Sequence, residues 1–171
     1  MRRVDAPPNP WHSSHVELLG EQPEVELQIF EEDARSALQS NESPDVPFRL
    51  GLNPYRGCFH ACAYCYARPT HEYLDFGAGT DFDRRLIVKR NLAEVLRREL
   101  SSKRRTPELV ALSGVTDCYQ PLEASYGITR DCIAALADFR WPVGVITKGA
   151  LIERDIDVLT RAHDRGGCRV W

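Results

Sequence analysis

Three cysteines, Cys58, Cys62 and Cys65, lie close together at the spacing C-x3-C-x2-C. Clustered thiolates in a short loop are typical of metal ligands, and three can hold three corners of a cubane iron–sulfur cluster. Because the loop has no fourth cysteine, one iron would stay open to bind a small molecule. A zinc site is the alternative, with His60 or His71 as the fourth ligand that a closed structural site requires.

The segments around this loop alternate between strand and helix. An apolar strand at 48–52 leads directly into the cysteines, and from 86 onward short apolar stretches alternate with helical spacing. Asn91 and Thr129 are expected to cap two of the helices. The pattern predicts an α/β fold with parallel strands joined by helical crossovers. The expected strands are 86–88, 109–115, 143–147 and one beginning at 168. Three helices are expected: one after Asn91, one from Thr129 to Phe139, and one over 155–163.

The first 48 residues differ from the rest. They are rich in proline and carry ten acidic and three basic side chains, a net charge of −7. We interpret 1–48 as an extended, acidic N-terminal extension with one alternating segment at 25–30 that suits an edge strand, and 49–171 as the core.

A second charge block lies at 84–105, where nine basic and two acidic side chains give +7. Such a stretch could contact the phosphates of a nucleic acid. A solvated helix face is the plainer interpretation, and pairing with the acidic extension is a third.

The composition predicts a cytoplasmic protein. No apolar run approaches the roughly 20 residues of a membrane helix, and no apolar segment follows the basic residues at the N-terminus. We therefore expect reduced thiols and no membrane association.

The cysteine loop and its surroundings resemble the radical S-adenosylmethionine (SAM) superfamily. The cysteine spacing, the aromatic Tyr64 before the last cysteine and the position after the first strand all match. The surrounding sequence, from about residue 33 to the C-terminus, is similar to that of the spore photoproduct lyase, or "DNA repair photolyase"-like, subgroup. The matching segments are 43–48, 53–58, 66–73, 116–121 and 147–148.

The resemblance implies a partial (β/α)6 barrel that binds a [4Fe–4S] cluster and SAM. Its activity would be reductive cleavage of SAM to a 5′-deoxyadenosyl radical that attacks a substrate, with nucleic acid as the leading substrate class and a flavodoxin- or ferredoxin-type electron donor. The metal ligands would be Cys58, Cys62 and Cys65. A non-catalytic metal- or cluster-binding protein, or an inactive fragment, is the alternative.

The resemblance implies three cofactor-binding residues, two at strand ends and one in the cysteine loop. Asp117 would accept a hydrogen bond from the SAM ammonium, Lys148 would approach the SAM ribose or carboxylate, and Tyr64 would pack near the adenine. Capping of the next loop by Asp117 and a solvated Lys148 are the alternatives. Tyr66 and Arg68 are expected to shape the loop.

The remaining cysteines are expected to be structural. Cys118 is a candidate for a catalytic role because it follows Asp117, but it lies four residues beyond the position, Gly114, that corresponds to the hydrogen-donor cysteine of spore photoproduct lyase. A structural role is the favoured interpretation, as it is for Cys132 and Cys168.

The chain contains three complete strand–helix units and the start of a fourth strand, whereas radical SAM cores generally use six. We therefore expect an N-terminal half-barrel whose last strand exposes unpaired backbone groups. Poor solubility or self-association, with little substrate turnover, would follow.

Overall fold

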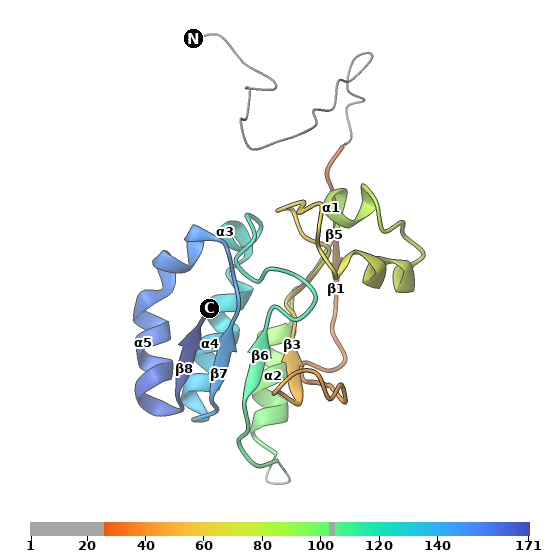
Figure 1. Ribbon diagram of the computed structural model, residues 1–171. Helices are drawn as coiled ribbons and strands as arrows, with labels where there is room; N and C mark the ends of the chain where they lie inside the picture. Colours follow the sequence, from red (N-terminus) through yellow and green to blue (C-terminus); the bar gives the residue numbers. More distant parts are fainter. Residues whose placement is uncertain (1–25, 103–104) are drawn as a thin grey trace, which may run out of the picture.

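The computed structural model describes residues 26–102 and 105–171. Its larger sheet has five strands in the order β2-β3-β6-β7-β8 (Figure 1). The four strands from β3 to β8 are parallel neighbours, and β2 pairs antiparallel with β3 at one edge. The predicted α/β fold with parallel strands is confirmed. The strands are β2 (Gln39–Ser40), β3 (Leu50–Leu52), β6 (Val110–Leu112), β7 (Val143–Val145) and β8 (Cys168–Val170).

Bulky and small residues alternate along the central strands. In β3, β6 and β7 the outer positions are Leu or Val, and the middle positions are Gly51, Ala111 and Gly144, which lie side by side in the strand register. The large side chains all point into the main core, so one face of the sheet carries the packing. The other face is lined by small residues at its centre.

Three helices cover the bulky face of this sheet, and Figure 1 shows them behind and beside the strands. The middle helix, α4, packs against both of the others. Apolar residues at helical spacing are buried, for example Leu92, Val95, Leu96 and Leu100 in the first helix. The helices are α2 (Leu92–Leu100), α4 (Ile128–Asp138) and α5 (Ile156–Arg165).

A second, smaller sheet of three strands has the order β1-β5-β4. Strand β1 (Gln28–Glu32) is an edge strand parallel to β5 (Arg85–Lys89), and β4 (Tyr55–Arg56) pairs antiparallel with the other side of β5. The alternating segment expected at 25–30 therefore forms an edge strand at 28–32. Ala37 and Leu38, which follow it, are buried in the main core, so this part of the N-terminal 48 residues packs with the rest.

Four short helical elements are also present in the described chain. They are the 3-10 helices η1 (Arg68–Leu74) and η2 (Ala150–Asp155) and the helices α1 (Asp81–Arg84) and α3 (Glu123–Tyr126).

None of the described helices is long and apolar enough to cross a bilayer.

One of the two predicted helix caps, Asn91, occupies the expected position, and the other, Thr129, does not. Asn91 stands at the N-cap of α2, but its side chain bonds the backbone of Ala34, with Ala34 N donating to Asn91 Oδ1 at 2.7 Å. Thr129 as the cap of α4 was wrong, because the helix begins at Ile128 after Gly127. The backbone amides of Thr129 and Arg130 in the first turn of α4 donate instead to the buried carboxylate of Glu123.

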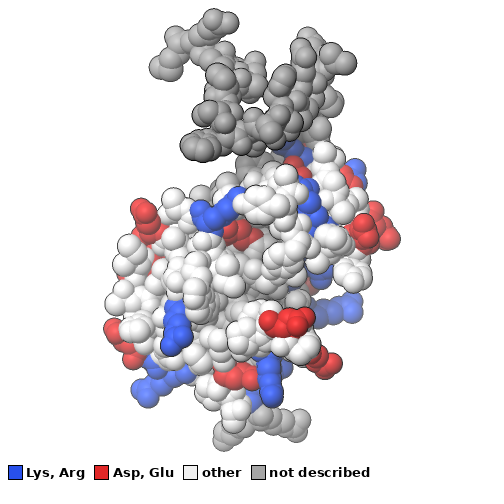
Figure 2. All heavy atoms as spheres, viewed as in Figure 1, with Lys and Arg blue, Asp and Glu red and all other residues white. Residues whose placement is uncertain are grey.

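Four of the nine basic residues in the stretch 84–105 are paired with acidic side chains. Arg84, Arg85, Arg90 and Arg97 form ion pairs with Asp83, Asp81, Glu31 and Asp138, respectively. On the face drawn in Figure 2, side chains of both signs are interspersed. This stretch is therefore partly solvated and partly paired within the chain. One of its pairs, Arg90 with Glu31, joins it to the acidic extension.

Candidate functional site: a cysteine-lined hollow

A hollow of about 430 Å³ lies where the cysteine loop meets the carboxyl ends of β6 and β7. All three clustered cysteines line it, together with residues that follow the two strands. The carboxyl ends of parallel strands are where α/β proteins commonly bind ligands. The lining residues are Cys58, His60, Cys62, Tyr64, Cys65, Tyr66, Ala67, Ser113, Val115, Thr116, Asp117, Ile146, Thr147, Lys148 and Trp171.

The start of the cysteine loop is held by buried polar groups. The carbonyl oxygen of Gly57 accepts from Thr116 Oγ1 at 2.6 Å and from Gln120 Nε2 at 3.3 Å, while Gln120 Oε1 accepts from Phe59 N at 2.9 Å. Gln120 is fully buried, so these bonds fix the backbone on both sides of Cys58. Thr116 and Gln120 were not predicted as loop anchors, although both belong to the 116–121 segment that follows β6.

Gly57 has a conformation that few other residues could adopt. Its φ is +73°, and a Cβ there would lie 2.7 Å from the carbonyl oxygen of Phe82. The next residue, Cys58, donates its N–H to that same oxygen at 2.9 Å. The loop can therefore approach α1 this closely only because residue 57 has no side chain.

Arg68 braces the far side of the loop. Its Nε donates to the carbonyl of Cys62 at 3.0 Å, and its Nη1 donates to the carbonyl of Gly79 at 2.7 Å and to Asp83 Oδ1 at 3.2 Å. Its guanidinium lies 5.3 Å from the ring centroid of Phe82. The structure thus gives Arg68 the loop-shaping role expected of it.

The three cysteines differ in exposure. Cys58 is buried, and burial raises the pKa of its thiol, whereas Cys62 and Cys65 are half-buried. Among residues 26–102 and 105–171, no three His, Cys, Asp or Glu side chains converge closely enough to hold a single metal ion. In a cubane cluster each thiolate binds a different iron, so its ligands need not converge on one point.

Lys148 follows β7 and points at the cysteine loop. Its Nζ lies 2.7 Å from Cys62 Sγ, and this hydrogen bond is the main reason why the pKa of Lys148 is raised. The side chain is exposed on its other sides. The prediction that Lys148 faces the site is consistent with this placement, whereas its contact with Cys62 was not predicted.

Asp117 joins the ends of β6 and β7. Oδ1 accepts from Tyr119 N at 2.9 Å and Thr147 Oγ1 at 2.6 Å, and Oδ2 accepts from Lys148 N at 3.0 Å. His60 Nε2 lies 3.3 Å from Oδ2 without hydrogen-bond alignment. A carboxylate offers about four acceptor positions, so these groups occupy almost all of them. The capping interpretation describes Asp117 well, and a direct bond to an ammonium would have to displace one of these donors.

Two tyrosines stand at the rim of the hollow. Tyr64 is 87% exposed, and the structure places no hydrogen bond on its hydroxyl within the described chain. Tyr66 is also exposed, but its hydroxyl donates to the carbonyl of Gly114 at 2.6 Å, which ties the cysteine loop to the end of β6. Tyr64 is thus free to cover a ligand, whereas Tyr66 shapes the loop as predicted.

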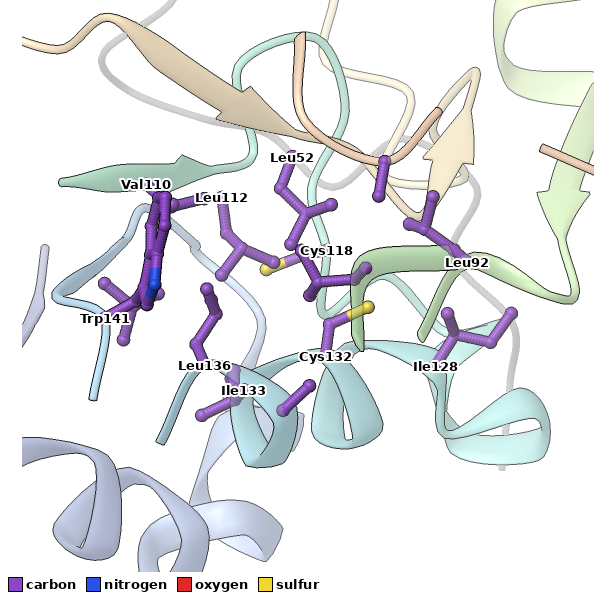
Figure 3. Close-up of a cluster of buried hydrophobic side chains, with 14 of the residues drawn as sticks. Leu52, Leu92, Val110, Leu112, Cys118, Ile128, Cys132, Ile133, Leu136 and Trp141 are labelled. Carbon is purple, nitrogen blue, oxygen red and sulfur yellow. The ribbon is translucent and has the colours of Figure 1, made fainter. Parts of the chain in front are cut away.

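The other three cysteines do not line the hollow. Cys118 and Cys132 are fully buried and point into the main core among Leu52, Leu92 and Ile128 (Figure 3). Burial raises the pKa of both thiols above their usual range. Cys168 packs against the edge of the same core. The structure therefore places Cys118 in a structural position and not in the candidate site.

Comparison with known proteins shows relatives without a described activity. Uncharacterized proteins of Mycobacterium bovis (Mb2609c) and Mycobacterium tuberculosis (Rv2578c) are 50% identical over 117 residues, which is 68% of this chain and 34% of each relative. An uncharacterized protein of Methanocaldococcus jannaschii (MJ0683) is 26% identical over 136 residues, or 79% of this chain and 48% of that protein.

The chain spans about a third of the length of the mycobacterial relatives that it matches. No family model matches the chain, and no solved structure matches it. What the fold and the site define is therefore a mixed α/β protein with a cysteine-lined hollow at the carboxyl edge of a parallel sheet.

Proposed function

We propose that this chain is the cluster- and cofactor-binding part of a radical SAM enzyme. The observation that carries the proposal is that Cys58, Cys62 and Cys65 share one hollow with the carboxyl ends of β6 and β7. Three thiolates and no fourth cysteine in that hollow suit a cluster with one open iron. A volume of about 430 Å³ lies within the usual range of small-molecule sites.

The strand order also supports this proposal. Strands β3, β6, β7 and β8 are neighbours in the order in which they occur along the chain, and helices α2, α4 and α5 connect them on one face. Sequential parallel strands with helices on one side are what the first units of a (β/α) barrel require. We propose that this sheet is the N-terminal half of a partial (β/α)6 barrel, with β8 as its open edge.

The chain's own residues would position the cluster and the cofactor. The thiolates of Cys58, Cys62 and Cys65 would hold the [4Fe–4S] cluster, which when bound supplies the electron that cleaves the sulfonium bond of SAM. Gly57 and Arg68 fix the two sides of the loop through backbone contacts. The exposed ring of Tyr64 would cover the adenine and limit the access of water.

Lys148 and Asp117 would act together on the cofactor. Asp117 holds the backbone of Lys148 and the hydroxyl of Thr147, so it sets the direction in which the Lys148 ammonium points. Lys148 would then meet the carboxylate or ribose of SAM through a charge-assisted hydrogen bond. This revises the part given to Asp117, from a ligand of the SAM ammonium to a positioning residue for Lys148.

The proposed substrate class and electron donor rest on the resemblance alone. Nucleic acid is the leading substrate class, and a flavodoxin- or ferredoxin-type protein is the expected donor. The basic stretch adds little support for nucleic acid, since four of its arginines are paired with carboxylates in the described chain.

A second candidate function is a non-catalytic metal-binding module. The observation that favours it is that His60 lines the same hollow as the three cysteines, so the residue types of a Cys₃His zinc site are present. In the described residues these side chains do not converge on one point, so zinc binding would require the loop to move. Zinc and a cluster differ in sulfide content and in colour, so the two candidates are separable by composition.

The test is SAM cleavage by the anaerobically reconstituted protein. The 171-residue chain is loaded with iron and sulfide and reduced with dithionite, SAM is added, and methionine and 5′-deoxyadenosine are quantified. We expect both products from the wild type and from Cys168→Ala, and neither from Cys58→Ala. A fully loaded protein that yields no product, and whose cluster spectrum does not respond to SAM, would refute the enzymatic proposal.

A further inference from the structure

A buried lysine lies outside the cysteine-lined hollow. Lys89, the last residue of β5, is only 4% exposed, whereas lysines are almost never fully buried without a partner. Its backbone N–H donates to the carbonyl of Pro54, but its ammonium has no hydrogen bond or ion pair with any residue in 26–102 or 105–171. Most of the side chain is buried, but Nζ itself is not fully enclosed by protein, so a counterion can reach it. A largely desolvated ammonium without a carboxylate partner gains from such a counterion.

The strand register places a second cation beside it. In the smaller sheet Arg56 lies opposite Ile87, two residues before Lys89, so the side chains of Arg56 and Lys89 leave the same face. Glu32 lies opposite Lys89 on β1, but its nearest recorded ion pair is with Arg56, at 3.9 Å from Oε1 to Nε. Glu32 is half-exposed and does not neutralise Lys89.

These side chains line a hollow of about 340 Å³. Three cations, Arg35, Arg56 and Lys89, and two carboxylates, Glu32 and Asp33, give its walls a net charge of +1. Burial and then the neighbouring Arg56 lower the pKa of Lys89 to about 8, against a smaller opposing effect of Glu32. The ammonium is therefore still mostly charged at neutral pH. This hollow and the cysteine-lined hollow have no lining residue in common.

We propose that Lys89 and Arg56 bind a phosphoryl group of a small soluble ligand. A guanidinium can bond two phosphate oxygens in a fork, and an ammonium adds a compact point charge. A dianion suits this pair better than a carboxylate, since one carboxylate, Glu32, is already on the wall and leaves Lys89 unpaired. Arg56 directly precedes Gly57 and Cys58, so the bound group would also steady the strand that leads into the cysteine loop.

The experiment is a calorimetric titration of the 171-residue protein with inorganic phosphate at pH 7, with acetate as the second arm. We expect phosphate to bind with a Kd on the order of 1 mM and acetate to bind at least about tenfold more weakly. Lys89→Met keeps most of the buried stem and should weaken phosphate binding by about tenfold or more. Arg90→Met is the matched control, because Arg90 is exposed and paired with Glu31, and it should leave the affinity unchanged.

Three results would overturn the proposal. These are no phosphate binding by the wild type at about 20 times the expected Kd, equal affinity in the wild type and Lys89→Met, and acetate binding as tightly as phosphate. If Lys89→Met does not fold, Arg56→Gln replaces it, with the same expected loss of affinity. None of these outcomes depends on an iron–sulfur cluster, so they are independent of the proposed radical SAM activity.

Discussion

Replacement of Glu123 should destabilise the protein more than replacement of any exposed acidic residue. Its side chain is completely buried, yet it joins three parts of the fold. The carboxylate accepts from the Tyr55 hydroxyl in β4, from the Thr129 and Arg130 amides that begin α4, and from Arg154 in η2. Burial, and then the Glu123 carboxylate, raise the pKa of Tyr55 above its usual range.

The size of the loss follows from the groups left without a partner. In Glu123→Ala the buried Tyr55 hydroxyl loses its acceptor, at about 1–3 kcal/mol, and α4 loses its cap, at about 1 kcal/mol. Arg154 is a third exposed and keeps Asp155, so its loss is small. The total is about 2–4 kcal/mol, a large share of the roughly 5–15 kcal/mol that stabilises a domain.

Urea unfolding followed by circular dichroism measures this loss. With a slope of about 2 kcal/mol/M, the midpoint of Glu123→Ala should fall by about 1–2 M. Glu123→Gln keeps one acceptor oxygen and should lose about 1–2 kcal/mol. Glu153→Ala, an exposed neighbour, is the control and should change stability by less than about 0.5 kcal/mol. If Glu123→Ala and Glu153→Ala unfold at the same urea concentration, the proposed role of this carboxylate is wrong.

Three further predictions follow from the same contacts. Gly57→Ala should cost about 2 kcal/mol or more and reduce cluster loading, whereas Gly127→Ala, at a similar φ but with nothing within 4 Å of the added Cβ, should cost about 1 kcal/mol in the same urea assay. Lys89 has a pKa of about 8 in the folded protein and 10.5 when free, so between these values the unfolded chain binds the extra proton. The unfolding free energy of the wild type should therefore rise relative to Lys89→Met by up to about 3 kcal/mol from pH 7 to 10.5 in phosphate-free buffer, and a constant difference would contradict this. Lys148→Ala and Asp117→Ala should each weaken SAM binding by about tenfold or more, or 1.5–3 kcal/mol, at unchanged iron content, and unchanged SAM affinity in both would exclude them from the cofactor site.

The repeating elements of the fold are predictable from local patterns. Leu92, Val95, Leu96 and Leu100 recur at helical spacing and are all buried in α2. The apolar strands at 50–52, 110–112 and 143–145 were expected within longer segments, and each is fully buried. Burial of a regular apolar pattern is a local property of the sequence, so the patterns predicted both helices and strands.

The smaller sheet was not predictable in the same way. Its strand β1 pairs with β5 across more than fifty residues, and nothing in either segment specifies the other. The cap of α4 is a similar case, since Glu123 reaches it from a preceding turn. Local propensity cannot distinguish such an acceptor from the helix's own Thr129.

The candidate site was predictable in its residues but not in their contacts. Strand ends converge at one edge of a parallel sheet, so Asp117 and Lys148 were expected to lie near the cysteine loop, and both line the hollow. That Asp117 bonds Thr147 and the Lys148 backbone depends on how two loops pack together. The anchors Thr116 and Gln120 were missed for the same reason.

The most direct test of the central claim is the iron and sulfide content of the anaerobically reconstituted protein and its cysteine variants. We expect about four irons and four sulfides per chain in the wild type, loss of the brown absorption in Cys58→Ala, Cys62→Ala and Cys65→Ala, and retention in Cys132→Ala and Cys168→Ala. Stoichiometric zinc without labile sulfide, or a full cluster in Cys58→Ala, would contradict the account.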